Sequence, residues 1–473
     1  MSSILSAPAS ILKKVPFWAL PMLLLAVFCA SKASWRSHPY YWDEAWSYGH
    51  AIHQFAQQQV SLSPGALEPA LSRGHPLLFY ASVAVWLQAT DNHLFYAHLY
   101  ALFVSILTAA TAWNLARQLS GSVAAGFVLA ALLVTQMFYS LSARLYPEML
   151  VALFSMLALW SFFQRQQVLT VLWCGLLLFT KESGIATMAA LTVFALLRNK
   201  GIGRAFWRDI AILSIPLLIS LGWYYWQYTV RGWWLFPEHT GMMVRDMKKV
   251  FGNLLQQGWT LVFYDGRSVL LIAALMAAGW SKGRLPASVR PERFQFIWLM
   301  GLFIGAYLAF TAANFQTERY LVVPLVAFIL TAVLWVWEGF STQPYVRAGL
   351  LSAYLLSQAF FLAFPAREIE VTTGYLPMMH SWQEGVQWCE SKQMQQDSIW
   401  TYFLMRYYMT DPHLGYLTEG KPFAFTKDST QARYCLFDSA ESGFLIPKLK
   451  ESLQLRALHS VGDEKHRVWI YDR

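Results

Sequence analysis

The sequence predicts an α-helical protein that crosses a membrane many times and ends in a small α/β domain. Of its 473 residues, 56% are hydrophobic and only 13% are charged, whereas soluble proteins carry about 25% charged residues. The hydrophobic residues are gathered in long blocks, as membrane-spanning helices require. In such a protein the net charge of +9 is expected in cytoplasmic loops and beside lipid headgroups, so it gives little reason to expect nucleic acid as a partner.

The first hydrophobic block runs from Pro16 to Ala30, directly after Lys13 and Lys14. It resembles a signal peptide, but the apolar pattern continues into further blocks, so we expect an uncleaved first helix. Altogether we expect about eleven spans, at residues 16–34, 94–117, 121–140, 146–163, 168–181, 183–198, 210–229, 267–281, 295–313, 319–338 and 346–364.

Residues 76–90 are apolar but too few to span. A helix of this length measures about 22 Å at 1.5 Å per residue, against roughly 30 Å of hydrocarbon core. Phe79, Tyr80 and Trp86 favour a helix that lies flat in the membrane interface. With this helix flat, the short basic loop after Arg198 lies in the cytoplasm, as the positive-inside bias favours. The N-terminus is then cytoplasmic and the C-terminal part of the chain lies outside.

The character of the sequence changes near Pro365, so we divide the chain into a membrane domain at 1–365 and an external α/β domain at 366–473. The external domain is expected to hold one helix and three strands, bounded by turn-forming residues. They lie at Trp382–Lys392, Ile399–Leu404, Tyr434–Phe437 and Val468–Tyr471. The four cysteines form no zinc-type cluster, and the spacing of Cys389 and Cys435 leaves open whether they pair.

The segment Tyr40-Tyr41-Trp42-Asp43-Glu44-Ala45-Trp46 follows the first span and lies in an expected external loop at 35–93. Carboxylates are costly near hydrocarbon, so acids placed there usually have a partner or a function. Aromatic neighbours fit an interface where rings lie against lipid or a sugar. A helix N-cap is the simpler explanation for Asp43, but we expect Asp43 and Glu44 to mark a catalytic site.

Further polar residues converge on the same face under this topology. Arginine binds phosphate oxygens in a bidentate manner, and a carboxylate can take the proton of an attacking hydroxyl. The pattern therefore favours transfer from a lipid-linked phosphate donor, although the arginines could also lie at span ends for solvation and Lys181 could pair with Glu182. These residues are Arg73, His75, Arg144, Glu148, Lys181, Glu182, Glu238, His239, Glu318, Arg319 and Tyr320.

Five different short motifs follow one another along residues 15–340, in an order that is found in one superfamily of membrane enzymes. They are Trp42-Asp43-Glu44, Gly74-His75-Pro76, Ala143-Arg144 through Pro147-Glu148, Thr180-Lys181-Glu182 and Glu318-Arg319-Tyr320. Together they resemble the GT-C membrane glycosyltransferases, in particular the protein O-mannosyltransferase and aminoarabinose transferase branch. The resemblance implies a GT-C type fold and an inverting transfer of a sugar from a polyprenyl-phosphate carrier. The sequence agrees in lacking an Asp-x-Asp motif for a nucleotide sugar.

The resemblance also implies roles for single residues. Asp43 matches the catalytic base, with Glu44 and Glu148 as further acids of the catalytic site. We expect the donor phosphate to be bound by Arg144, Arg319 and Lys181, and the acceptor site to be shaped by His75, Tyr146 and Tyr320. His239 resembles a histidine that helps hold a structural metal, with His75 as a second candidate, although the acid expected before Pro76 is replaced by Gly74-His75. The sequence requires no cofactor, and a divalent metal stays open.

The expected partners are a polyprenyl-phosphate-linked sugar, an acceptor that is a lipid, a glycan or a protein, and membrane lipids, but no nucleic acid. The expected location is the cytoplasmic (inner) membrane, with the active site and the C-terminal domain outside. Two other functions stay open: a transporter or flippase of lipid-linked glycans, and an O-antigen ligase or polymerase. A transporter would need charged groups along a route through the bilayer, whereas this sequence gathers them at one face.

Overall fold

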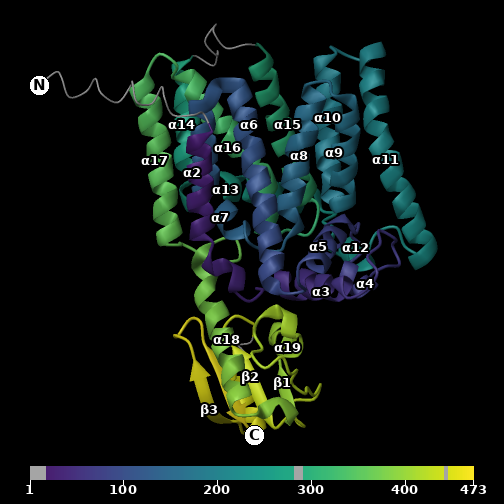
Figure 1. Ribbon diagram of the computed structural model, residues 1–473, viewed down its shortest axis with the longest axis vertical. Helices are drawn as coiled ribbons and strands as arrows, with labels where there is room; N and C mark the ends of the chain where they lie inside the picture. The colour runs from purple at the N-terminus through teal and green to yellow at the C-terminus, as the bar shows by residue number, and fades with distance from the viewer. Residues whose placement is uncertain (1–17, 282–290, 442–445) are drawn as a thin grey trace, which may run out of the picture.

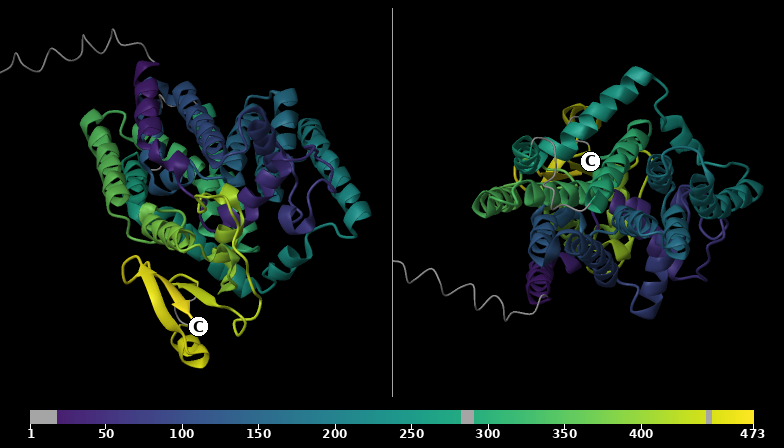
Figure 2. Two further views of the ribbon diagram at one scale, coloured as in Figure 1. Left: turned by 60° about the horizontal axis from the view of Figure 1, so that its bottom comes forward. Right: turned by 90° about the horizontal axis from the view of Figure 1, so that it is seen from above.

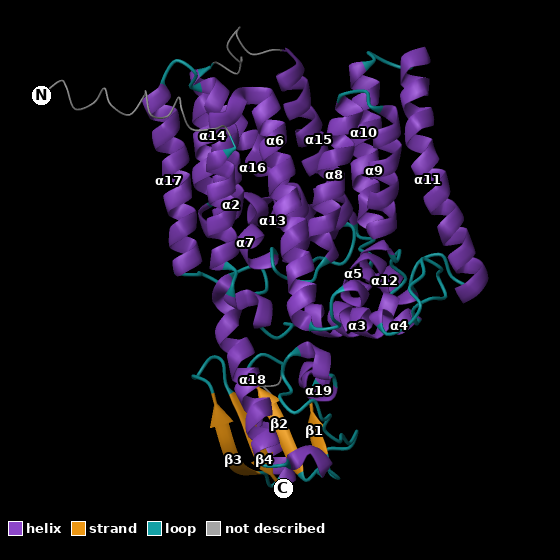
Figure 3. Ribbon diagram, in the orientation of Figure 1, coloured by secondary structure: helices purple, strands orange, loops and turns teal. Residues whose placement is uncertain are grey.

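The computed structural model describes residues 18–281, 291–441 and 446–473. It is a bundle of long helices with a small sheet-containing domain beyond one end (Figures 1 and 3). That end comes toward the viewer in the left view of Figure 2. Lys13, Lys14 and Pro16, on which the reading of the first block depends, lie outside the described residues.

Each hydrophobic block expected to span a membrane falls on a helix. The bundle helices are α2 (Ala19–Ser31), α6 (Leu94–Val134), α7 (Gln136–Leu141), α8 (Pro147–Phe163), α9 (Gln167–Thr180), α10 (Ile185–Arg198), α11 (Arg204–Arg231), α13 (Met247–Phe263), α14 (Ser268–Trp280), α15 (Pro291–Ala312), α16 (Val322–Gly339) and α17 (Pro344–Ala363). Five helices of the described chain are long and apolar enough to cross a membrane, or six if α13 and α14, bent by 101°, form one span.

This number is lower than the eleven blocks for two reasons. The first is that α6 contains two of the blocks, joined at Gly121, whose backbone is not helical (φ 86°, ψ 175°). Ser105 Oγ, before Gly121 in the chain, donates to the carbonyl oxygen of Ser142, after it, at 2.8 Å. Since a continuous helix would hold these residues far apart, the chain folds back at Gly121. The second is that five helices that each hold one block are shorter than the roughly 20 residues of a full span: α2, α8, α9, α10 and α14 have 13, 17, 14, 14 and 13 residues.

Four short helices gather at the end of the bundle that faces the small domain (Figure 1). They are α3 (His50–Ala56), α4 (Pro69–Ser72), α5 (Leu78–Ala89) and α12 (Pro237–Met242). Helix α5 corresponds to the segment expected to lie flat, and its orientation in a membrane stays a prediction. Its aromatic residues differ from expectation, because Phe79 and Tyr80 are buried inside the protein rather than free to face lipid.

The C-terminal domain consists of a four-stranded sheet and its helices. The strands β1 (Ile399–Thr401), β2 (Tyr434–Asp438), β3 (Arg456–Val461) and β4 (Val468–Asp472) have the order β1-β2-β4-β3. β1 pairs parallel to β2, with Ile399 opposite Tyr434, and the other pairs are antiparallel. The helices are α18 (Leu376–Ser391), α19 (Phe403–Thr410) and α20 (Ile446–Leu453).

The expected helix and three strands are present, with two differences. The first expected strand ends at Thr401, and α19 begins at Phe403. The edge strand β3 was missed because its side chains are exposed or half-buried and its sequence, Arg-Ala-Leu-His-Ser-Val, lacks the alternation of apolar and polar residues that marks a strand. Cys389 and Cys435 are buried free thiols, so they do not form a disulfide.

The C-terminal domain packs against the loop that carries Asp43. Tyr408 on α19 accepts a hydrogen bond from the backbone N–H of Trp42 at 3.2 Å, and His50 Nδ1 lies 2.6 Å from Asp411 Oδ2. The ring of Trp382 on α18 stacks on Tyr41 with a centroid separation of 5.3 Å. These contacts hold the loop between the bundle and the small domain.

Candidate active site

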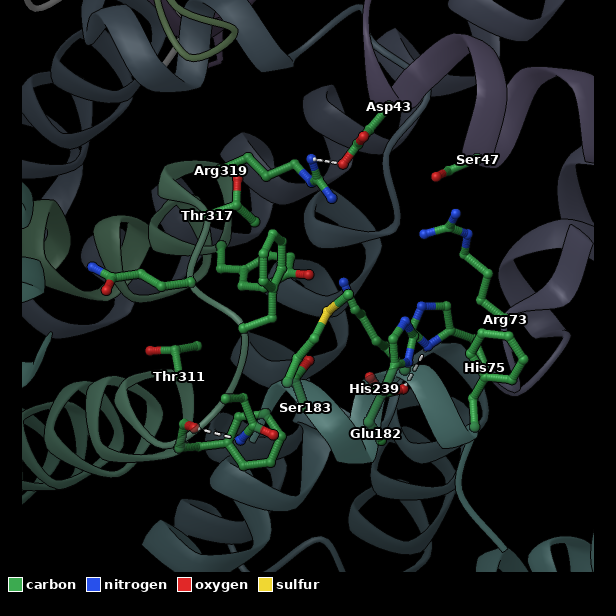
Figure 4. Close-up of a pocket in the computed structure, with 18 of the residues that line it drawn as sticks. Asp43, Ser47, Arg73, His75, Glu182, Ser183, His239, Thr311, Thr317 and Arg319 are labelled. Carbon is green, nitrogen blue, oxygen red and sulfur yellow. Dashed lines mark hydrogen bonds and ion pairs between the residues drawn. The ribbon is translucent and has the colours of Figure 1, made fainter. Parts of the chain in front are cut away.

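A cavity of about 1310 Å³ opens at the end of the bundle, beside the linker to the C-terminal domain. One part of its wall is apolar and comes from α9, α10, α11, α12 and α15, with Leu178, Ile185, Leu217, Leu221, Met242 and Phe310. The other part is polar, with Asp43, Ser47, Arg73, His75, Lys181, Thr317, Arg319 and Glu370. Figure 4 shows how several of these polar side chains surround the cavity.

Asp43 lies in the polar wall. It follows Trp42, whose backbone is left-handed with φ 52°, and it directly precedes the short helix at Glu44–Gly49. Its side chain makes no capping hydrogen bond to that helix. Instead, Oδ1 accepts a hydrogen bond from Trp46 Nε1 at 2.9 Å and Oδ2 accepts one from Arg319 Nη1 at 2.6 Å. The carboxylate is therefore oriented toward the cavity by side chains, with 18% of its side-chain surface exposed.

Arg319 is the centre of the polar wall. It lies on the short helix Glu318–Leu321, and its Nη1 also donates to Glu370 Oε1 and Oε2, at 3.2 and 3.3 Å. Its Nε lies 3.6 Å from Glu148 Oε1. Three carboxylates thus surround one buried guanidinium, which pairs well with several because it presents five donors in a rigid fork.

Glu370 was missed by the sequence reasoning. It lies on the linker after α17 and also accepts hydrogen bonds from Thr317 Oγ1 at 2.9 Å and from Tyr146 OH at 3.1 Å. One signal was available, because two acids follow the last span on the same predicted face as Asp43, in Arg367-Glu368-Ile369-Glu370. They were assigned to the external domain rather than to the site.

Lys181 pairs with a different acid from the one expected. Its Nζ donates to Glu148 Oε1 at 2.7 Å and lies 4.2 Å from the centre of the Tyr320 ring. Lys181 and Tyr320 line the cavity, whereas Glu148 is buried behind them. Glu182 pairs with His75 instead, so the expected Lys181–Glu182 contact is replaced by two separate pairs.

Glu44 and Arg144 form a buried pair outside the cavity wall. Arg144 Nε donates to Glu44 Oε2 at 2.8 Å, and the Leu145 N–H donates to Oε1 at 2.6 Å. Burial raises the pKa of Glu44, but Arg144 and His98 outweigh burial and hold the pKa at about 2. Neither Glu44 nor Arg144 lines the cavity, and both are buried. This position favours a structural role for both residues, and the expected roles of Glu44 in catalysis and of Arg144 at the donor phosphate stay predictions. Tyr146 is also buried, and it reaches the site through Glu370.

Arg73 stands apart from Lys181 and Arg319, the buried cations of the cavity. Its guanidinium carbon lies 3.5 Å from the centre of the Trp46 ring, and its Nε is buried without a hydrogen-bond partner. In the part of the chain that the structure describes, Arg73 has no ion pair and no hydrogen bond from its side chain. It is therefore a cation of the cavity that no carboxylate neutralises.

The fold is similar to that of solved structures. ArnT from Cupriavidus metallidurans bound to undecaprenyl phosphate matches over 98% of both chains, with a TM-score of 0.60 and 14% sequence identity. The apo state of the same protein matches over 95% of this chain and 98% of that chain, with a TM-score of 0.57 and 14% identity. The chain has a GT-C fold. The archaeal oligosaccharyltransferase AglB from Archaeoglobus fulgidus is similar at a TM-score of 0.47 and 9% identity, covering 93% of this chain and 71% of that chain. No family model and no curated protein sequence matches.

Within this GT-C fold, His75 and His239 face each other across the cavity wall. Their ring centroids are 5.0 Å apart, and His75 Nδ1 lies 2.8 Å from Glu182 Oε2. Burial raises the pKa of Glu182, but His75 outweighs it and holds the pKa well below the usual range. Burial lowers the pKa of His239 to about 4, so this ring is neutral at pH 7.

A metal ion at this position would have the two imidazole rings of His75 and His239 as candidate ligands. Over residues 18–281, 291–441 and 446–473, no three His, Cys, Asp or Glu side chains are grouped so that they could hold a metal ion. Because His75 already uses Nδ1 to contact Glu182, the residues present do not fit a complete metal site.

Proposed function

We propose that this protein is a membrane glycosyltransferase that moves a sugar from a polyprenyl-phosphate carrier to an acceptor hydroxyl, with Asp43 as the base. The observation that carries the proposal is the division of a single cavity into an apolar wall and a polar wall that contains Asp43. An apolar wall suits a polyprenyl chain, and the polar wall suits its phosphate and sugar. The similarity to an ArnT structure bound to undecaprenyl phosphate supports this choice of donor.

The reaction follows from the position of Asp43. Asp43 accepts the proton of the acceptor hydroxyl as its oxygen attacks the anomeric carbon of the sugar. The bond between that carbon and the phosphate oxygen breaks, and polyprenyl phosphate leaves with the electron pair. Attack from the side opposite the phosphate inverts the configuration.

Arg319 and Lys181 supply positive charge at the polar wall. Arg319 fixes Asp43 through the 2.6 Å contact, so the base is oriented before the acceptor arrives. Lys181 and Arg319 also favour the charge that develops on the leaving phosphate. Glu370 and Glu148, the other acids around Arg319, keep its guanidinium in place.

The reaction takes place on the outer face of the cytoplasmic membrane in this proposal. The N-terminus is then cytoplasmic and the C-terminal domain external, where its contacts with the Asp43 loop place it beside the acceptor, which is a lipid, a glycan or a protein. The proposed step uses no cofactor.

The proposal is tested by mass spectrometry of envelope lipids, glycans and glycoproteins from cells that carry the wild type or Asp43→Asn at equal expression. We expect one species to lose a single sugar mass in the variant. Asp91→Asn is the matched control, because Asp91 is exposed and lies outside the cavity wall. Identical profiles, with the variant present in the membrane, would contradict the proposal and favour a transporter.

A further inference from the structure

Arg73 differs from Lys181 and Arg319, the buried cations of the polar wall, in having no acidic partner. Arg245 also lines the cavity without an ion pair among the described residues, but its side chain is exposed to solvent, whereas Arg73 is half-buried. Lys181 is 2.7 Å from Glu148, and Arg319 contacts both Asp43 and Glu370. A phosphate that binds to either of these cations must compete with a carboxylate already in place. Removing one partner from a buried ion pair is costly, so these two cations are poor primary ligands for an incoming anion.

Arg73 has no such competition. It makes neither an ion pair nor a side-chain hydrogen bond with any described residue, and its Nε is buried without a partner. A guanidinium that keeps its donors free and lines a cavity matches the geometry of a phosphate, which it binds in a bidentate manner. We propose that Arg73 is the residue that binds the phosphate of the lipid carrier, an assignment that rests on the proposed function.

The backbone around Arg73 directs this side chain into the cavity. Arg73 has φ 50° and Gly74 has φ 70°, so two consecutive residues are left-handed at the end of α4. A side chain at position 74 would meet Phe236 Cβ and Trp233 Cζ3 at 2.9 Å, so this tight turn needs glycine there. A left-handed arginine is uncommon and is often found at ligand sites. Figure 4 shows the guanidinium of Arg73 between Ser47 and His75 on the cavity side.

Trp46 links this cation to the base. The guanidinium carbon of Arg73 lies over the Trp46 ring, 3.5 Å from its centre, and Trp46 Nε1 donates to Asp43 Oδ1 at 2.9 Å. The ring restricts the guanidinium without using its N–H donors, which stay free for an anion. One indole therefore supports both Arg73 and Asp43, which sets the phosphate site at a fixed place relative to the base.

The assignment is tested with the purified full-length protein in lipid nanodiscs. Undecaprenyl phosphate is titrated by native mass spectrometry, with undecaprenol, which has the same chain but no phosphate, as the second probe. We expect Arg73→Met to weaken binding of undecaprenyl phosphate about tenfold or more and to leave binding of undecaprenol unchanged. Arg73→Lys should restore part of the loss, since an ammonium keeps the charge but lacks the fork.

Arg36→Met is the matched control. Arg36 also lies over an aromatic ring, Phe95 at 5.1 Å, but outside the cavity wall, so its loss should change neither affinity. Thermal unfolding of each variant separates lost binding from misfolding. Equal affinity of wild type and Arg73→Met for undecaprenyl phosphate would overturn the assignment, as would a wild type that binds both probes equally. Neither result depends on sugar transfer, so the assignment and the proposed function can fail separately.

Discussion

Glu44 offers the sharpest contrast between a catalytic and a structural role. It was expected to act in catalysis, yet it is buried outside the cavity wall and paired with Arg144. We predict that Glu44→Gln destabilises the protein and that molecules which remain folded still transfer sugar. The neutral amide keeps the shape of the side chain but removes the charge that Arg144 requires.

The magnitude follows from the position of the carboxylate in the structure. The pKa of Glu44 is about 2 rather than the ordinary 4.5, and this difference corresponds to about 3 kcal/mol at 1.36 kcal/mol for each pH unit. Loss of one partner from a buried pair costs about 3–5 kcal/mol. Both arguments predict that Glu44→Gln lowers the free energy of unfolding at pH 7 by about 3–5 kcal/mol.

The pH dependence has a definite sign. Because the pKa of Glu44 is lower in the folded state, its stabilisation is complete above pH 4.5 and is lost as the pH falls from 4.5 toward about 2. Denaturant titrations in mild detergent should therefore show the largest gap between wild type and Glu44→Gln at pH 7 and a smaller gap at acid pH.

Glu68→Gln is the matched control, since Glu68 is exposed and lies in the same segment 35–93. It should leave the free energy of unfolding within about 0.5 kcal/mol of the wild type. A Glu44→Gln protein with wild-type stability and no sugar transfer would refute the structural role and return Glu44 to the catalytic site.

Two further predictions concern the linker and the C-terminal domain. Glu370→Gln removes one of the carboxylates on Arg319 and should slow transfer about tenfold or more, from the loss of charged hydrogen bonds. Glu370→Asp should recover part of the rate, and Glu384→Gln, at an exposed position of α18 outside the cavity wall, should change little. Asp411→Asn removes the contact with His50 and should speed hydrogen exchange in α3 and α19. Burial raises the pKa of Asp411, but His50 holds the net pKa below its usual 3.8, so the wild type should show the same loosening only as the pH falls below 3.8. Unchanged exchange at pH 7 in the Asp411 variant would show that this contact does not hold the domain.

Much of the fold could be predicted because membrane helices are recorded in the sequence as apolar blocks. The blocks locate the helices of the bundle, but they do not show where each helix ends or reverses, as at Gly121. The strand β3 was missed for a related reason, since an exposed edge strand has little apolar pattern. Local composition predicts elements well only where one face is buried.

The site residues could be predicted as a group but not as pairs. Asp43, Lys181 and Arg319 do come together at the cavity, as the motifs indicate. Which carboxylate meets which cation depends on side-chain packing between segments far apart in sequence, such as the 100 positions that separate Glu44 from Arg144. No spacing rule gives that information.

The sequence also could not show that the Arg73 side chain has no acidic partner. In the sequence, Arg73 is distinguished only as a basic residue before Gly74-His75-Pro76. Its free guanidinium becomes visible only when Lys181 and Arg319, the buried cations of the same wall, are seen paired with carboxylates.

The central claim is tested most directly by reconstituting the transfer. Lipids extracted from cells that carry Asp43→Asn should contain the unused donor, because the blocked enzyme no longer consumes it. Purified wild-type protein in vesicles made with this extract should release free polyprenyl phosphate and add one sugar mass to an acceptor, while the Asp43→Asn protein should do neither. Equal release and transfer by both proteins would contradict the role of Asp43 as the base. No transfer by the wild type from an extract that holds the polyprenyl-phosphate sugar and the acceptor would contradict the assignment as a glycosyltransferase.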